Sequence, residues 1–146
     1  MALPLDTVKR FHALLAAADV PGALSLLHPQ VEWREAERSP YFAGTLRGVD
    51  AVVAGVLKPI TTDIDAFVTR PTDFVSDGSR VVSLGVYEGV SRKTGLHLSA
   101  PFVHLWSVEG DRLRKFMQFT DSTAWREPLL PLQFEGLQMR RVNISA

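Results

Sequence analysis

The chain has 146 residues, of which 46% are apolar and 22% charged, proportions typical of folded globular domains and unlike disordered or membrane proteins. This length predicts a single domain at 1–146, with a core over about 5–125 and a C-terminal extension at 126–146. Sixteen basic residues balance sixteen acidic ones, so the whole-chain charge offers no attraction for nucleic acid or for an anionic membrane.

The absence of cysteine excludes disulfides, thiolate catalysis and cysteine-ligated metals. The four histidines are His12, His28, His97 and His104, and they form no short metal-ligand spacing. We therefore expect neither a metal nor another cofactor. No stretch has the pattern of a signal peptide or approaches the ~18 apolar residues of a membrane span, so a cytoplasmic location is expected.

The first two elements are predicted to be helices. Apolar residues recur at three- and four-residue spacing over Leu5–Ala18, with His12 and the charged residues on other faces, as in an amphipathic helix. A second short helix is predicted over Val20–Leu27, because Pro21 suits its first turn and His28-Pro29 ends it.

A short strand at Val31–Trp33 is predicted to lead into a mobile flap. The flap joins a polar stretch at 34–40 to a turn-rich one at 41–48. Its carboxylates, among them Glu35, alternate with arginines, a pattern typical of a solvated, charge-balanced loop. A third helix is predicted over Val49–Leu57, and Pro59 should end or kink it.

Four long strands are predicted next, because four segments are rich in β-branched and aromatic residues and are separated by glycine-containing turns. These segments are Ile64–Val75, Arg80–Val90, Leu96–Val108 and Arg112–Thr120. Successive hairpins make an antiparallel meander. Together with the N-terminal helices it predicts an α+β fold in which helices cover the concave face of a curved sheet and enclose a pocket.

Titratable and amide side chains among large apolar residues mark the last two strands as the functional region. Strand alternation places Phe102, His104 and Trp106 on one face, and Phe119 and Asp121 share parity in the last strand. A bulge would change that parity, which keeps Gln118 as a further candidate. A carboxylate near apolar surface has a raised pKa and becomes a useful base near neutral pH.

Several short motifs, in this order of elements, resemble one known family. They are Val31-Glu32-Trp33, Gly44 to Gly48, Phe102 to Trp106, Gly110 and Phe119-Thr120-Asp121. Over roughly Leu5 to Trp125 the chain resembles the SnoaL-like and ketosteroid-isomerase-like branch of the nuclear transport factor two superfamily. That resemblance implies a conical barrel of a curved, mainly antiparallel sheet with a deep apolar pocket, and a homodimer formed through the outer sheet face.

The resemblance also implies residue roles. Asp121 matches the acid–base aspartate of SnoaL-like cyclases, and His104 matches a polar pocket residue; Tyr41 is the other expected donor. The complete residue combination of ketosteroid isomerase is not found. The expected substrate-binding residues are mostly aromatic and would suit a flat, apolar ligand: Trp33, Phe42, Tyr87, Phe102, Trp106, Gln118 and Phe119.

Each assignment has an alternative that concerns structure alone. Asp121 can instead cap a helix that begins at Ser122, accepting from the backbone N–H of Thr123 or Ala124. His104 can be a core histidine satisfied by one hydrogen-bond partner.

Three hypotheses for the function follow. The first is a cofactor-independent isomerase or cyclase that transfers protons on a hydrophobic carbonyl compound, with Asp121 as base. The second is dehydratase or epoxide-hydrolase-like hydration chemistry at the same residues. The third is a non-catalytic small-molecule carrier or dimeric interaction module with the same fold.

Overall fold

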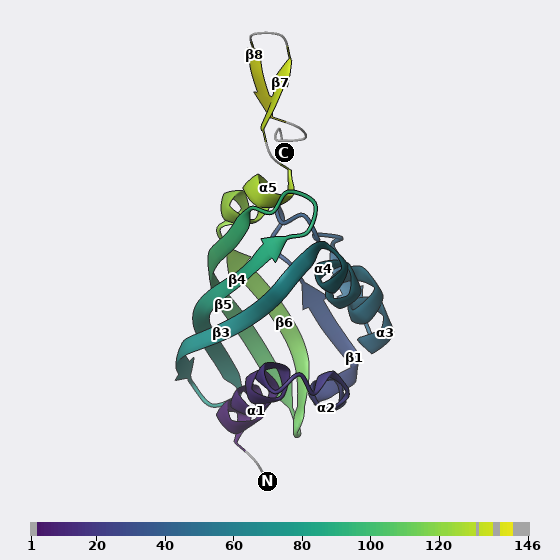
Figure 1. Ribbon diagram of the computed structural model, residues 1–146. Helices are drawn as coiled ribbons and strands as arrows, with labels where there is room; N and C mark the ends of the chain where they lie inside the picture. Colours follow the sequence, from purple (N-terminus) through teal and green to yellow (C-terminus); the bar gives the residue numbers. More distant parts are fainter. Residues whose placement is uncertain (1–2, 131, 136–137, 142–146) are drawn as a thin grey trace.

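The computed structural model describes residues 3–130, 132–135 and 138–141 and has the expected α+β architecture (Figure 1). The helical elements are α1 (Pro4–Ala16), α2 (Val20–Ser25), α3 (Val49–Val52), the π-helix η1 (Val53–Leu57), α4 (Lys58–Asp63) and α5 (Ser122–Leu129). The strands are β1 (Leu27–Arg34), β2 (Thr45–Arg47), β3 (Ile64–Ser76), β4 (Arg80–Ser91), β5 (His97–Glu109), β6 (Arg112–Thr120), β7 (Leu132–Glu135) and β8 (Gln138–Arg141). Part of the C-terminal extension predicted at 126–146 lies outside the described residues.

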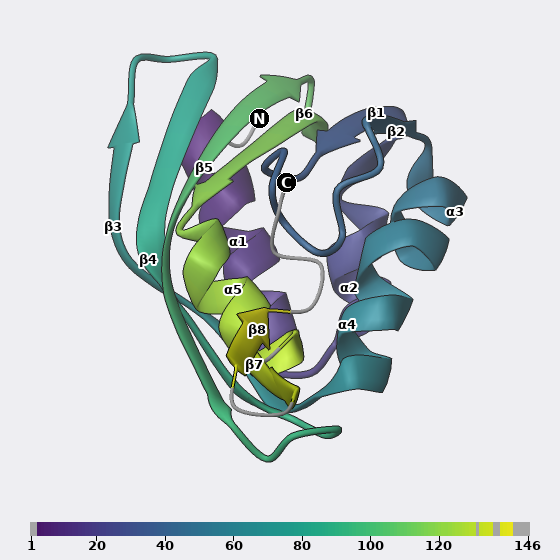
Figure 2. The same cartoon turned by 90° about the horizontal axis from the view of Figure 1, so that it is seen from above.

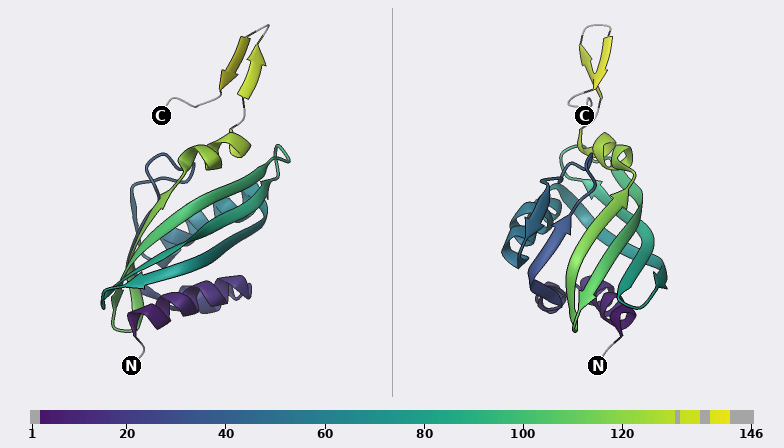
Figure 3. Two further views of the ribbon diagram at one scale, coloured as in Figure 1. Left: turned by 90° about the vertical axis from the view of Figure 1, so that its left-hand side faces the viewer. Right: turned by 180° about the vertical axis from the view of Figure 1, so that it is seen from behind.

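One six-stranded sheet forms the wall of a cone. Its strand order is β2-β1-β6-β5-β4-β3, and every neighbouring pair is antiparallel except β1 with β6, which is parallel. Viewed from above, the sheet curves around the helices on its concave side (Figure 2). The helices α1 and α5 lie at opposite ends of the sheet (Figure 3). The prediction of a conical, mainly antiparallel sheet covered by N-terminal helices is confirmed.

The helix α1 packs its apolar stripe onto β3 and β4. Val8, Phe11 and His12 are buried on this inner face. The placement of His12 on a polar face was wrong: His12 is four residues after Val8 and next to Phe11, so it lies on the side that meets the sheet.

The helical region after β2 does not end at Pro59. It passes from α3 through one π-helical stretch, Val53–Leu57, into α4, which reaches Asp63. Pro59 lies in the first turn of α4, where a missing N–H is tolerated, and the π turn just before it changes the hydrogen-bond spacing. Of the two effects predicted for Pro59, an end or a kink, the end of the helix is therefore wrong.

Strand parity sorts the side chains of β5 and β6 between the cone interior and the outer surface. Phe102, His104 and Trp106 face inward, as predicted, and His104 lies opposite Gln118 in the register. Irregular pairing near the start of β6 places Gln118 inward, whereas Phe119 is outward and 51% exposed. The expectation that Phe119 lines the pocket is thus contradicted.

The helix α5 closes one end of the cone. Asp121 is its N-cap and accepts from the backbone N–H groups of Thr123 and Ala124 at 3.1 and 3.3 Å. Trp125 follows one turn later and is fully buried among the rings of Tyr41 and Tyr87. Within the described residues no helix has both the length and the apolarity to cross a membrane.

Candidate functional site

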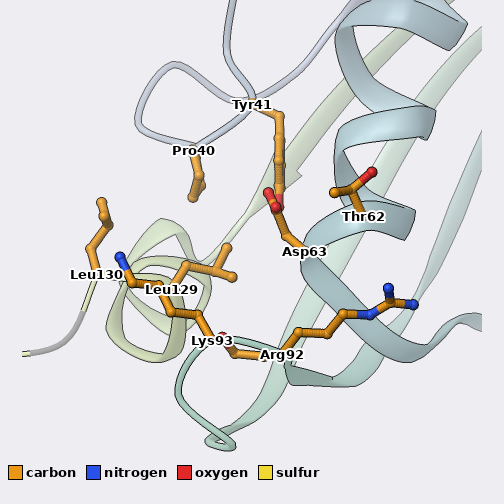
Figure 4. A pocket seen from close by; sticks show the side chains of 9 residues that line it. Pro40, Tyr41, Thr62, Asp63, Arg92, Lys93, Leu129 and Leu130 are labelled. Carbon is orange, nitrogen blue, oxygen red and sulfur yellow. The ribbon is translucent and has the colours of Figure 1, made fainter.

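A cavity of about 520 Å³ lies at the α5 end of the cone (Figure 4). It is bounded by the loop at 35–44, the end of α4, the end of β4 and the last turn of α5. Its lining residues are Pro40, Tyr41, Thr62, Asp63, Ser91, Arg92, Lys93, Leu129 and Leu130. We call this cavity the mouth pocket.

The carboxyl of Glu35 is buried near Tyr41, a residue of the mouth-pocket wall. Glu35 directly follows β1, is 4% exposed, and accepts a hydrogen bond from the Trp33 indole N–H at 3.0 Å. Burial raises the pKa of Glu35 from 4.5 to about 7, because a charged carboxylate is poorly solvated there, while hydrogen bonds from Trp33 and Gln118 partly oppose the rise. The group therefore titrates near neutral pH inside an apolar cone.

A chain of hydrogen bonds runs from the loop beside Glu35 across the sheet. The Ala36 N–H donates to Gln118 Oε1 at 3.1 Å, and Gln118 Nε2 donates to the Tyr87 hydroxyl at 2.9 Å. The Tyr87 hydroxyl is in turn hydrogen-bonded to His104 Nε2. All of these side chains are at most 4% exposed. The chain links the loop after β1 to β6, β4 and β5, and its Gln118, Tyr87 and His104 side chains are buried.

The direction of the hydrogen bonds along this chain determines which ring nitrogen of His104 carries the proton. Gln118 donates to Tyr87, so the Tyr87 proton is directed to His104 Nε2, and the ring proton of a neutral His104 lies on Nδ1. Burial is the main reason that the pKa of His104 lies well below its ordinary 6.5, and the nearby His12 lowers the pKa further. His104 is thus a neutral imidazole whose Nδ1 has no hydrogen-bond partner within the described residues.

A second buried polar cluster surrounds Ser83. The Ser83 hydroxyl lies 3.1 Å from His12 Nε2 and accepts from the Trp106 indole N–H at 3.0 Å. The His12 ring stacks parallel to that of His104 with centroids 5.7 Å apart. Burial lowers the pKa of His12 from 6.5 to about 4, which keeps it neutral at pH 7.

Tyr41 lines the mouth pocket and lies near Glu35. It is 8% exposed, and its hydroxyl donates to Asp63 Oδ2 at 2.9 Å. Burial, the hydrogen bond to Asp63 and the negative charge of nearby Glu35 all raise the pKa of Tyr41 above its ordinary value. Tyr41 therefore keeps its proton and offers a neutral O–H donor at the wall of the pocket.

Comparison with known proteins assigns the family. A model of the SnoaL-like domain matches residues 8–116. The chain belongs to the SnoaL-like family. No curated protein shows significant sequence similarity to it.

Solved structures share this SnoaL-like fold over nearly their whole length. An NTF2-like protein from Burkholderia thailandensis E264 is 27% identical, with a TM-score of 0.85 over 90% of this chain and 100% of that one. An NTF2-like protein of unknown function from Burkholderia pseudomallei K96243 is 29% identical, with a TM-score of 0.78 over 88% and 98%. TerC, co-crystallised with polyporic acid, is 26% identical, with a TM-score of 0.76 over 86% and 97%.

Most of the expected site residues of this SnoaL-like chain do gather inside the cone. They are Trp33, Tyr87, Phe102, His104, Trp106 and Gln118, with Tyr41 at the mouth. Rings of this set pack directly on one another: Phe102 stacks on His104 with centroids 4.1 Å apart. Their packing makes the interior a dense aromatic cluster around the polar chain.

Three expected residues lie elsewhere. Asp121 is exposed at the N-cap of α5, so the expected shared pocket with His104 does not form; Gln118 occupies the position beside His104 instead. Phe119 is on the outer face, as described above. Phe42 is half-buried beneath the guanidinium of Arg34, 5.1 Å from its ring centroid.

Two interior residues escaped the sequence-based interpretation, Glu35 and His12. The solvated-loop interpretation of Glu35 is wrong, although it holds for the exposed Glu37. A period-two reading would have found Glu35, because Val31 and Trp33 are buried on the same parity in β1. The carboxylate and histidine groups of the described residues form no cluster of three suited to a metal ion.

Proposed function

We propose that the protein is a small-molecule enzyme that transfers protons on a hydrophobic carbonyl compound, as an isomerase or cyclase, with Glu35 as the acid–base group. The carrying observation is the Glu35 carboxyl, buried in an apolar cone with its pKa raised to about 7. Such a group is about half ionised at neutral pH, so it can accept a proton and return it in one catalytic cycle.

Groups near Glu35 can stabilise the negative charge that forms on the substrate when Glu35 accepts a proton. Tyr41 stays protonated and lines the mouth pocket, where its O–H can donate to a substrate oxygen that gains negative charge. His104 and Gln118 are proposed as positioning residues, because their hydrogen bonds hold Tyr87 and the loop at Ala36 in place beside Glu35. Asp121 keeps its capping role in this proposal.

Access to Glu35 is proposed to require movement of the loop at 35–44. This loop contains neither helix nor strand, so its displacement breaks no sheet pairing. Glu35 and Glu37 of the loop accept hydrogen bonds from Trp33 and Arg34 of β1. Further side-chain hydrogen bonds tie the loop to the rest of the cone, from Ala36 to Gln118 and from Tyr41 to Asp63. A ligand that takes over the Tyr41 hydroxyl would release the second of these and open the way to Glu35.

The ligand proposed is a flat, hydrophobic small molecule. The aromatic interior supports this class, as does the structural similarity to TerC, the protein co-crystallised with polyporic acid. Polyporic acid is therefore a suitable first probe for binding.

The test is exchange of carbon-bound protons with solvent, which detects proton abstraction before any product is known. A panel of aromatic ketones would be incubated with the protein in D₂O, and loss of the α-proton signal followed by NMR. Glu35→Gln should slow exchange by about 10²- to 10⁴-fold, the usual contribution of a general base. Glu37→Gln, an exposed carboxylate two residues away, is the matched control. Equal exchange rates for the Glu35 variant and the parent would refute the proposal. A substrate that gains or loses the mass of water would point to hydration or dehydration instead.

Ligand binding without turnover is the second candidate function. It is favoured by the burial of Glu35, because only 4% of the residue is exposed. In that case polyporic acid or an aromatic ketone would bind, and no exchange above the solvent rate would follow.

A homodimer formed through the outer sheet face is also proposed. Met117 and Phe119 lie on this face of β6 and are 39% and 51% exposed, an apolar surface that a second copy would cover. Light scattering coupled to size exclusion should give twice the chain mass, and Phe119→Glu should halve it. A parent protein that elutes as a monomer at micromolar concentration would overturn this assembly.

A further inference from the structure

The mouth pocket carries charge and hydrogen-bonding groups that the proton transfer at Glu35 does not use. Its Ser91 is the last residue of β4, and its Lys93 follows two residues later, on the side away from the Tyr41 and Asp63 pair (Figure 4). Among the described residues, Ser91 lacks a hydrogen-bond partner for its hydroxyl and Lys93 lacks an ion-pair partner.

Ser91 supplies a buried hydroxyl. The residue is 1% exposed, and its Oγ has no hydrogen-bond partner within the described residues. An unpaired hydroxyl that is removed from water costs free energy until a partner reaches it. Ser91 is therefore a prepared hydrogen-bonding group in the pocket wall.

Lys93 supplies a positive charge. It has no ion-pair partner in the part of the chain that the structure describes, whereas the adjacent Arg92 is paired with Asp65, Nε to Oδ1 at 2.6 Å. In Figure 4 the Lys93 side chain extends toward Pro40 and Leu130, and the Arg92 side chain extends the opposite way. The positive charge of Lys93 thus lies at the end of the pocket that is away from Tyr41 and Asp63.

The opposite wall is different in character. There the Asp63 carboxylate already accepts the Tyr41 hydroxyl, so this end offers a hydrogen-bonded pair that carries the negative charge of the carboxylate, and an anionic group is directed to the opposite end. The apolar side chains of Pro40, Leu129 and Leu130 lie among the lining residues. The pocket has one cationic end, an apolar middle and one polar end, and its volume of about 520 Å³ is in the range of sites for small organic molecules.

We infer that the mouth pocket selects amphipathic organic anions, with the anionic group paired to Lys93, the apolar body on Leu129 and Leu130, and a polar atom within reach of Ser91. This inference rests on the proposed function, because it names the charge class of the substrate that enters the same site. A carboxylate or an acidic enol would satisfy it, and the neutral or cationic analogue would bind less tightly.

The test compares two molecules of nearly the same shape, naphthalene-2-carboxylate and naphthalene-2-carboxamide, by ligand-observed NMR titration at pH 8. The parent protein should bind the carboxylate about fivefold more tightly, the factor of one partly exposed ion pair, and added salt should reduce this preference. Lys93→Gln should abolish the preference and leave carboxamide affinity unchanged. Ser91→Ala should weaken both probes and preserve the preference.

Lys115→Gln is the matched control, because Lys115 lines the other described cavity, of about 240 Å³ on the outer face of the sheet. Its preference should equal that of the parent. The inference is overturned if neither probe binds, if the parent does not distinguish them, or if the preference survives Lys93→Gln. Loss of the preference in the Lys115 variant alone would place the anion on the outer face and would also overturn it. The NMR titrations measure binding only, so a negative result in them does not affect the Glu35 proton-exchange experiment. Likewise, a negative result in the exchange experiment does not affect the measured preference for the carboxylate.

Discussion

Replacement of Glu35 by glutamine should remove the proposed acid–base group and should raise the stability of the protein relative to the parent as pH increases from 5 to 8. The pKa of Glu35 rises from 4.5 to about 7 on folding, so between these values the folded chain holds a proton that the unfolded chain has released. The stability that the protonated group provides is complete below pH 4.5 and is lost as pH rises through 7.

The size of the effect follows from the shift. Each pKa unit is worth about 1.4 kcal/mol, and linkage gives a loss of about 2.5 kcal/mol between pH 5 and pH 8 that is due to this carboxyl alone. Glutamine does not titrate. Relative to the parent, Glu35→Gln should therefore gain about 2.5 kcal/mol in unfolding free energy over the same interval, whatever constant cost its amide brings.

The measurement is urea unfolding of parent and variant at pH 5 and pH 8, followed by tryptophan fluorescence. Contributions from histidines and other groups are common to both proteins and cancel in the difference. Glu37→Gln should show the same difference from the parent at both pH values, because Glu37 is exposed. If the Glu35 variant also shows no change in that difference, the carboxyl is not desolvated and the proposed base loses its physical basis.

Three further predictions concern the other polar groups. The pKa of His12 falls to about 4 on folding, so stability should drop as pH falls from 6.5 toward 4, and His12→Asn should make acid unfolding shallower in circular dichroism. Asp121→Ala should lower the unfolding free energy by about 1 kcal/mol, because the helix cap is lost. Asp121→Asn should retain the cap and leave proton exchange unchanged. A large loss of exchange in the asparagine variant would instead identify Asp121 as the base. ¹⁵N NMR should find the His104 proton on Nδ1, and Tyr87→Phe should shift it toward Nε2; an Nε2-bound proton in the parent would contradict the donor order.

Local signals in the sequence were enough for the main strands and for the cap of α5. The strand β3 was predicted at Ile64–Val75 and spans Ile64–Ser76, because alternating apolar residues and the glycine turns that bound the hairpins act over a few residues. Gly78, Gly95 and Gly110 all have positive φ, which the other residue types rarely adopt. The cap at Asp121 is local in the same sense, since it involves only the next three residues.

The composition of the site depended on contacts between distant parts of the chain. Glu35 is acidic and lies among arginines, so its own segment predicts exposure to solvent. Its burial has two causes: it continues the inward parity of Trp33 in β1, and Gln118 holds the loop at the neighbouring Ala36. Gln118 and Ala36 are 82 residues apart in the sequence. His12 and Ser83 are 71 residues apart and meet only because α1 packs across β4.

By itself, therefore, the sequence determined the class of fold and the inward face of β5, which follow from short-range periodicity and turn chemistry. Its short motifs added the family resemblance. The tertiary structure decided which polar groups share the interior: the register of β6 places Gln118 opposite His104, Asp121 lies beyond the strand as the N-cap of α5, and Glu35 is buried. The pKa of a carboxyl is set by its surroundings rather than by its identity, so only the folded arrangement could single out Glu35.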